Sequence, residues 1–348
     1  MQAIVLKSQG QLEIEQRPLP ERFGPGQALV RVAAAGICGS DIPRAFDGKA
    51  YHYPLVLGHE FSAVVEDPAD SGLQAGQRVV VFPLLPRLDD PFSLIGEYAV
   101  SSDYDYYGSR RDGGMQQYLW VPRANLIPVP DHVSLVAAAM TEPAAVSLHA
   151  VSKLRVASAT VALVIGGGPI GVMVAQFLRI RGCTAVWVAE PDGRKRELAR
   201  NLGFDVIDPT AEDTVAAIAE RSNGRGADCV VEAVGLALTF EQAFRACATF
   251  GQLVLLGNPA GSLSLSAELV STILRRELTI YGTWNSKVTP VGHSEWDEVL
   301  GRMGQTLVVE PLISHRVTIA EAPAIMEAMY SRQTWFNKVI VQMDPELR

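Results

Sequence analysis

The chain has 348 residues, of which 48% are hydrophobic and 20% are charged, and its formal net charge is −8. This length predicts two domains, and the negative charge argues against a protein that wraps nucleic acid. The start of the chain lacks the long apolar segment of a signal peptide, and no run reaches the roughly 18 apolar residues of a membrane span. Four cysteines are too few for a disulfide framework in a chain of this size. We therefore expect a reduced, cytoplasmic protein that binds neither nucleic acid nor a membrane.

Short alternating apolar runs, broken by glycine and proline, fill the first part of the chain, for example at 27–32, 77–82 and 116–121. Such runs predict short strands of a β-rich domain. The pattern changes at Thr160, where apolar strands begin to alternate with amphipathic helices. We expect strands at 160–165, 185–189, 229–233, 252–256 and 278–281, and helices at 169–181, 194–202, 240–248 and 269–275.

This alternation predicts an α/β fold with a parallel, doubly wound sheet. After Trp284 the pattern becomes mixed again and ends in a strand-like segment at 338–342. The sequence therefore predicts that a nucleotide-binding domain, residues 152–284, is inserted between two parts of a β-rich catalytic domain, residues 1–151 and 285–348.

A glycine fingerprint of the form G-x-G-x-x-G lies at Gly166, Gly168 and Gly171, after a buried strand and at the start of a helix. Gly166 allows the tight turn, Gly168 lets a pyrophosphate approach the backbone, and Gly171 lets the helix pack on the strand. Pro169 and Ile170 open the helix, whose N-terminal N–H groups would face the phosphates. The segment predicts a dinucleotide site, although an ordinary glycine turn is the alternative.

Glu190 stands at the end of the second strand, where a carboxylate would hydrogen-bond the ribose hydroxyls of NAD and repel a 2′-phosphate. Arg194 and Lys195 follow closely. They could line the adenine pocket, tolerate NADP, or form a solvated helix face. We expect NAD as the cofactor.

A second constellation consists of Cys38, Asp41, His59, Glu60 and Glu142. A cysteine thiolate, a histidine nitrogen and a carboxylate oxygen together suit zinc, and three protein ligands leave one position open for substrate. Asp41 is a suitable partner for a zinc-bound histidine. The alternative is a buried cysteine, a core histidine and a glutamate at a helix start, and spacing alone does not separate the two.

The order of these motifs, with C-G-S-D at 38–41, G-H-E at 58–60, E-P at 142–143 and then the fingerprint, resembles the medium-chain zinc-dependent alcohol and polyol dehydrogenases over nearly the whole chain. Within that family, several stretches are similar to the galactitol-1-phosphate 5-dehydrogenases, namely 38–44, 53–62, 83–86, 108–114, 274–278 and 310–316. The resemblance implies a GroES-like catalytic domain joined to a Rossmann domain. A homodimer or homotetramer is expected.

The resemblance also implies roles for individual residues. Cys38, His59 and Glu142 would hold one catalytic zinc ion, Glu60 would be an alternative ligand, and Ser40 would take the proton of the substrate hydroxyl. The alcohol would then give its hydride to the nicotinamide.

The chain departs from the family at the lobe that usually carries four cysteines around a structural zinc. The corresponding positions are Arg87, Asp90, Ser93 and Ser101, so we expect no structural zinc. We predict an ordered lobe with an Arg87–Asp90 salt bridge and a small apolar core, rather than a mobile loop. That core would consist of Phe92, Leu94, Ile95 and Tyr98.

A second departure is Pro43, where many relatives have a histidine, so a proton from Ser40 would have to leave through a cofactor hydroxyl and water. Three arginines suit phosphate recognition, although each could instead form a structural salt bridge. They are Arg44, Arg110 and Arg111. The expected walls of the substrate pocket are Tyr51, His52, Tyr53, Trp284 and Asn285.

Several functions remain open at this point. A sugar-alcohol phosphate and a free polyol or other secondary alcohol, as for sorbitol or threonine dehydrogenases, are nearly equal as substrates. The zinc-free NADPH-dependent quinone or enone reductases share the fold but lack the Cys, His and Glu ligands. A catalytically dead structural or sensory relative is the alternative that is not an enzyme.

Overall fold

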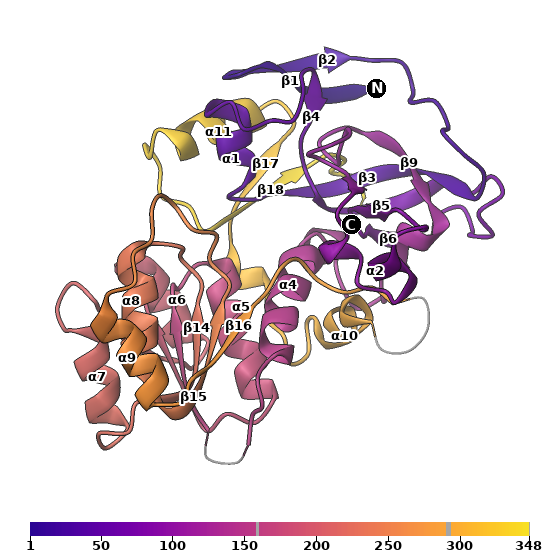
Figure 1. Ribbon diagram of the computed structural model, residues 1–348. Coiled ribbons are helices and arrows are strands. Elements are labelled where there is room, and N and C mark those ends of the chain that lie inside the picture. Colours follow the sequence, from indigo (N-terminus) through magenta and orange to yellow (C-terminus); the bar gives the residue numbers. More distant parts are fainter. Residues whose placement is uncertain (158–159, 290–293, 348) are drawn as a thin grey trace. The chain divides into compact units, whose positions relative to one another are not determined.

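The computed structural model describes residues 1–157, 160–289 and 294–347. Contacts between residues group the chain into two compact units (Figure 1). Unit 1 combines Met1–Pro143 with Lys287–Arg348, and unit 2 consists of Ala144–Ser286. Within the described ranges, no helix is long and apolar enough to cross a membrane.

Unit 1 is rich in β-structure. Its strands are β1 (Gln2–Ser8), β2 (Gln11–Gln16), β3 (Gln27–Ile37), β4 (Leu55–Val56), β5 (Glu60–Asp67), β6 (Arg78–Val81), β7 (Leu84–Pro86), β8 (Tyr104–Tyr106), β9 (Tyr118–Pro122), β10 (Leu126–Pro128), β17 (Ile313–Thr318) and β18 (Lys338–Gln342). Its helices are α1 (Asp41–Phe46), α2 (Pro91–Leu94), α3 (Leu135–Ala138), α10 (Glu295–Arg302) and α11 (Ala322–Tyr330), with short 3-10 turns at Tyr98–Val100, Arg123–Asn125 and Glu310–Leu312. The main sheet has seven strands in the order β10-β6-β5-β3-β18-β17, with β9 paired to β3.

Strand β3 is the centre of this sheet, and it is buried along almost its whole length. Most of its residues are apolar or small, and neighbouring residues along it are buried in succession. It runs antiparallel to β5 and to β18, and Gly36 pairs with Glu60 on one side and with Ile340 on the other. The end of β3 therefore lies beside the beginnings of β5 and β18.

Unit 2 contains a six-stranded parallel sheet in the order β13-β12-β11-β14-β15-β16. The strands are β11 (Val161–Ile165), β12 (Ala185–Ala189), β13 (Asp205–Ile207), β14 (Ala227–Glu232), β15 (Cys247–Leu255) and β16 (Thr279–Gly282). The helices are α5 (Pro169–Ile180), α6 (Gly193–Asn201), α7 (Thr214–Arg221), α8 (Ala237–Ala246) and α9 (Ala267–Arg275), and α4 (Thr141–Ser152) begins in unit 1 and ends in unit 2. Figure 1 shows α7, α8 and α9 packed next to one another, and α5 packs on β11 and β12.

The predicted α/β class and the doubly wound parallel sheet are confirmed. Two details of unit 2 differ from the sequence-based expectation. The helix expected to reach residue 248 ends at Ala246, and Cys247 already begins β15, where it pairs with Ala227 of β14. Strand β13 and helix α7 were not expected, because their short segments mix polar and apolar residues without a clear period.

Candidate metal and cofactor sites

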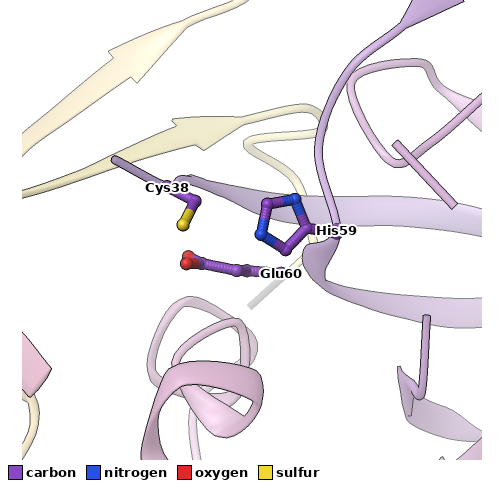
Figure 2. Close-up of side chains that lie close together, drawn as sticks. All are labelled: Cys38, His59 and Glu60. Carbon is purple, nitrogen blue, oxygen red and sulfur yellow. The ribbon is translucent and has the colours of Figure 1, made fainter. Parts of the chain in front are cut away.

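The end of β3 and the beginning of β5 in unit 1 bring a thiol, an imidazole and a carboxylate together. Cys38 follows the last residue of β3, His59 precedes β5, and Glu60 is the first residue of β5. One potential ligand atom from each lies within 4.8 Å of the other two, and Figure 2 shows the three side chains converging. Among the residues that the structure describes, this is the group of Cys, His and acidic side chains that could hold a metal ion.

Gly58 shapes the turn that aims His59 at this group. Its φ is +95°, a conformation that favours glycine. A Cβ at Gly58 would also lie 2.9 Å from Met115 Cγ and 3.1 Å from the Met115 nitrogen. The G-H-E motif therefore carries a backbone requirement as well as two functional side chains.

Asp41 connects the parts of this group, as its position in C-G-S-D suggested. Its Oδ2 accepts a hydrogen bond from the Cys38 N–H at 3.0 Å, and its Oδ1 lies 3.5 Å from His59 Nδ1. Burial favours the neutral acid, but His59 and Arg44 lower the pKa of Asp41 below its ordinary value. Burial likewise acts against a charged imidazole, yet Asp41 and Cys38 raise the pKa of His59 well above its ordinary value.

Glu142 lies near this group, but its carboxylate is not among the three converging ligand atoms. It lies in the first turn of α4, where it is buried, and its Oε1 accepts a hydrogen bond of 3.3 Å from the Tyr106 hydroxyl. Burial raises the pKa of Glu142 to about 7, opposed by the charge of His59 and reinforced by Glu60. The structure thus assembles Cys38, His59 and Glu60, and Glu142 is hydrogen-bonded to Tyr106.

The residues of this group fit a zinc ion. Sulfur, nitrogen and carboxylate oxygen form a donor set that zinc prefers. Asp41 faces the Nδ1 side of the His59 ring, which leaves Nε2 as the nitrogen that could hold a metal ion.

Ser40 and Arg44 lie next to Cys38. The Ser40 hydroxyl donates to Cys38 Sγ at 3.3 Å, and Arg44 Nη1 donates to Ser40 Oγ at 2.7 Å. The same Arg44 nitrogen lies 3.4 Å from Asp41 Oδ1. Helix α1 carries Arg44 one turn after Ser40, which explains the contact. Pro43 offers no side-chain group that could accept a proton.

Two neighbours of the group were missed by sequence reasoning. Lys338, the first residue of β18, forms a buried ion pair with Glu60 Oε2, and Tyr106 binds Glu142. Both lie far from their partners along the sequence, and neither belongs to a recognisable motif. For Lys338, the available signal in the sequence was a lysine at the start of a strand that is otherwise largely apolar.

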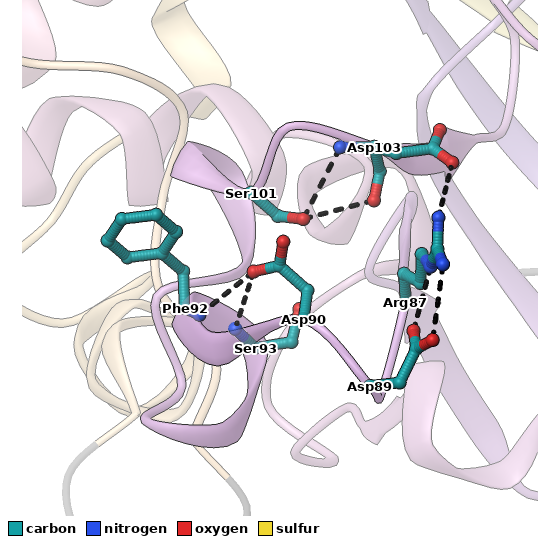
Figure 3. Close-up of polar contacts among 7 residues, drawn as sticks. All are labelled: Arg87, Asp89, Asp90, Phe92, Ser93, Ser101 and Asp103. Carbon is teal, nitrogen blue, oxygen red and sulfur yellow. Dashed lines mark hydrogen bonds and ion pairs between the residues drawn. The ribbon is translucent and has the colours of Figure 1, made fainter.

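The lobe without cysteines is ordered by hydrogen bonds (Figure 3). The predicted Arg87–Asp90 salt bridge is wrong: Arg87 pairs with Asp89 at 2.7 Å and with Asp103 at 3.4 Å. Asp90 instead caps α2, where its carboxylate accepts from the Phe92 and Ser93 N–H groups. This local bond satisfies N–H groups that a helix start leaves unpaired.

The predicted apolar core of the lobe is also wrong. Phe92, Leu94 and Ile95 are 50%, 74% and 69% exposed, and Tyr98 is only partly buried. Ser101 closes the lobe by accepting from the Asp103 N–H and donating to the Asp103 carbonyl. Backbone and capping hydrogen bonds therefore connect the residues of this lobe.

The two adjacent arginines, Arg110 and Arg111, already have partners. Arg110 donates to the Tyr104 carbonyl, and its guanidinium lies 4.3 Å from the centroid of the Tyr104 ring. Arg111 Nε lies 2.6 Å from Asp105 Oδ2, and the guanidinium covers Phe23 at 4.4 Å. They line a groove of about 530 Å³ in unit 1.

The expected pocket walls lie in different units. Tyr51 and Tyr53 of unit 1 are exposed, and His52 contacts the carbonyls of Pro54 and Arg110. Trp284 and Asn285 belong to unit 2, where Trp284 lines a largely apolar cavity of about 420 Å³.

The glycine fingerprint of unit 2 has the geometry that a phosphate-binding turn needs. Gly166 has a φ of +105°, and a Cβ there would lie 2.7 Å from Val234 Cγ2. A Cβ at Gly171 would overlap the Gly166 carbonyl, whereas the space around Gly168, the N-cap of α5, is open. Pro169 occupies the first turn of α5, followed by Ile170. Free N–H groups at this helix start suit a pyrophosphate.

Glu190 is buried and is hydrogen-bonded to the glycine turn. Its Oε2 accepts from the Gly167 N–H at 2.7 Å, and its Oε1 accepts from the Asp192 N–H at 2.9 Å. Arg194 is exposed and Lys195 is partly buried at the start of α6. Arg196, which sequence reasoning passed over, holds the Glu190 carbonyl and pairs with Asp208 at 2.6 Å.

Comparison with known proteins matches both units. The alcohol dehydrogenase GroES-like domain family matches residues 24–131, and the zinc-binding dehydrogenase family matches residues 169–305. Galactitol 1-phosphate 5-dehydrogenase from Escherichia coli (strain K12) is 32% identical over 91% of this chain and 92% of its own length. Sorbitol dehydrogenase from Bos taurus is 29% identical over 99% of this chain and 96% of its own length.

Solved structures agree with these matches. The crystal structure of E. coli galactitol-1-phosphate dehydrogenase has a TM-score of 0.93 and 29% identity, covering 99% of this chain and 100% of that one. A putative zinc-binding dehydrogenase from Sinorhizobium meliloti 1021, bound to NADP, has a TM-score of 0.89 and 29% identity, covering 98% and 99%. The expected GroES-like and Rossmann combination is thereby confirmed. The chain belongs to the medium-chain zinc-dependent alcohol and polyol dehydrogenases, which are oxidoreductases that use zinc and a nicotinamide cofactor.

Proposed function

We propose that the protein oxidises a secondary hydroxyl of a sugar-alcohol phosphate and passes the hydride to NAD. The observation that carries the proposal is the convergence of Cys38, His59 and Glu60 in a chain that also has the glycine fingerprint. The galactitol 1-phosphate relative supports a phosphorylated polyol. A free polyol or another secondary alcohol is the second candidate, which the sorbitol dehydrogenase relatives favour.

Cys38, His59 and Glu142 are the proposed zinc ligands, with Glu60 as an alternative ligand. When bound, zinc supplies a Lewis acid that lowers the pKa of the substrate hydroxyl, and NAD supplies the hydride acceptor. Asp41 fixes the Cys38 backbone and the His59 ring through the contacts described above, so the donor atoms are held before a ligand arrives.

Ser40 is the proposed acceptor of the hydroxyl proton. Arg44 donates to one lone pair of Ser40 Oγ, and the other lone pair can take the substrate proton. As Oγ takes that proton, Ser40 passes its own hydroxyl proton on, so the residue acts as a relay and stays neutral. The Arg44 guanidinium stays protonated and cannot act as a base, but its charge favours negative charge developing beside Ser40. Because Pro43 has no acceptor, the proton would leave through a cofactor hydroxyl or water.

Arg44 is also the proposed contact for the substrate phosphate, because among the three arginines it is the one hydrogen-bonded to Ser40. Arg110 and Arg111 remain proposed contacts as well, and all three arginines also have protein partners, since Arg44 lies 3.4 Å from Asp41 Oδ1. A guanidinium matches phosphate geometry with two parallel N–H groups.

The first prediction concerns the metal. We expect one zinc ion per chain in protein purified without chelator, and loss of both the zinc and turnover in Cys38→Ser and His59→Ala. NADH binding should persist, because the fingerprint lies in unit 2 and the metal group in unit 1. Elemental analysis, fluorescence titration with NADH and a steady-state assay provide the three measurements.

The matched control is Cys183→Ser, which changes a buried cysteine of unit 2 that is not part of the metal group. It should retain zinc and activity. A stoichiometry near two in the wild type, or full zinc content in Cys38→Ser, would contradict the assignment.

The second prediction concerns the cofactor. We expect kcat/KM to be at least about tenfold higher with NAD than with NADP, because a like charge at Glu190 opposes the 2′-phosphate by roughly 1.4 kcal/mol or more. Glu190→Gln removes the negative charge and keeps one oxygen, which can accept from Gly167 or from Asp192 but not from both. The variant should lower the ratio of kcat/KM with NAD to kcat/KM with NADP, mainly by improving the use of NADP. Equal use of both cofactors by the wild type would show that Arg194 or Lys195 overrides the carboxylate.

The third prediction concerns the substrate. A charge-assisted contact to phosphate contributes about 1.5–3 kcal/mol, so Arg44→Met should lower kcat/KM for a polyol phosphate about ten- to a hundredfold more than for the free polyol. The same comparison of kcat/KM for the two substrates in Arg110→Ala and Arg111→Ala measures how much each of these arginines contributes to phosphate binding.

An equal loss of kcat/KM for both substrates in Arg44→Met would mean that Arg44 acts only through Ser40 and does not bind the substrate phosphate. If the wild type prefers the free polyol, the phosphate proposal fails before any variant is made, and the second candidate function replaces it.

A further inference from the structure

Glu60 and Lys338 form an ion pair that is almost completely withdrawn from solvent, with side chains 1% and 6% exposed. Burial alone would favour the uncharged amine, yet Glu60, Cys38 and Glu142 raise the pKa of Lys338 above its ordinary value. The ammonium lies beside the Glu60 carboxylate, where β3 ends and β5 and β18 begin. A buried charge without a partner is strongly unfavourable, so each member of the pair holds the other in place.

The backbone of three strands builds this pair. Gly36 of β3 is directly opposite Glu60 of β5, and Lys338 precedes Val339, which is opposite Ile37. A Cβ at Gly36 would overlap Glu60 Oε2 and lie 3.1 Å from Lys338 Cε. The glycine thus leaves the space in which the carboxylate reaches the ammonium.

Glu60 has two possible partners within reach. One is Lys338, and the other is a metal ion held by Cys38 and His59, whose donor atoms lie within 4.8 Å of a Glu60 oxygen. A carboxylate that stayed on the metal would occupy a position that substrate needs, because catalytic zinc sites keep one position open. The strength of the ion pair between Lys338 and Glu60 therefore determines how often the Glu60 carboxylate is bound to Lys338 and not to the metal.

We propose that Lys338 is a positioning residue that competes with the metal for the Glu60 carboxylate and thereby keeps one metal position accessible to substrate. This inference rests on the metal site of the proposed function. It assigns a role to the first residue of the last strand and to Gly36, which stands between the two charged side chains.

The test is the rate at which zinc leaves the protein for an excess of a coloured chelator, with no substrate or cofactor present. Lys338→Met keeps the apolar stem but removes the charge, so Glu60 turns to the metal and completes a closed ligand set. We expect zinc release to slow by about tenfold, the size typical of changes in a residue that contacts a metal ligand. KM for the alcohol should rise while kcat changes less, because Glu60 then competes with substrate.

Three further variants separate positioning from general damage. Lys338→Arg keeps the charge and should release zinc at the wild-type rate. Gly36→Ala adds a Cβ that would overlap the Glu60 carboxylate and displace it from Lys338, so zinc release should again be slower. This variant tests the inference if Lys338→Met does not fold. Lys287→Met removes the cation of a second ion pair of unit 1, with Glu97, and should leave release unchanged.

The double variant Lys338→Met/Glu60→Gln identifies the cause. If Glu60 is the group that Lys338 restrains, the slowing disappears in the double variant. Faster release from Lys338→Met, release at the wild-type rate, or slowing that persists without Glu60 would each overturn the inference. A wild-type protein that binds no zinc would instead contradict the proposed function.

Discussion

The register of β5, β3 and β18 is the constraint on which the metal group depends. Antiparallel pairing places Glu60 and Ile340 opposite Gly36, so a thiol, a carboxylate and an ammonium meet where three strands start or end. Because side chains alternate between the faces of a sheet, a slip of one residue would send Glu60 or Lys338 to the opposite face. The buried apolar residues of β3 and its neighbours fix that register, and thus hydrophobic packing positions polar chemistry.

Local rules explain what the sequence predicted well. The fingerprint of unit 2 needs only a strand, a turn and a helix in succession, and close contacts require glycine at Gly166 and Gly171. Likewise, Cys38, Asp41, His59 and Glu60 lie in two short motifs whose order matches a known family. Lys338 and Tyr106 escaped prediction because each meets its partner through tertiary structure, and no spacing along the chain records such a contact.

In the lobe without cysteines, local hydrogen bonds explain why a prediction based on charge alone is wrong. Arg87 and Asp90 have opposite charges and lie close in sequence, but Asp90 is used by the N–H groups at the start of α2, and Arg87 turns to Asp89 and Asp103. The apolar side chains of the lobe face solvent, since so short a segment has no second layer against which to bury them. Glu190 is a related case, because its two carboxylate oxygens accept from the backbone N–H groups of Gly167 and Asp192.

The central claim is that a single zinc ion is held by one sulfur ligand together with nitrogen and oxygen ligands in unit 1. X-ray absorption at the zinc edge of protein purified without chelator measures this directly. The account predicts one zinc ion per chain whose nearest neighbours are one sulfur atom and several nitrogen or oxygen atoms, and loss of the sulfur contribution in Cys38→Ser. A shell dominated by sulfur, or a sulfur contribution that survives in Cys38→Ser, would contradict it.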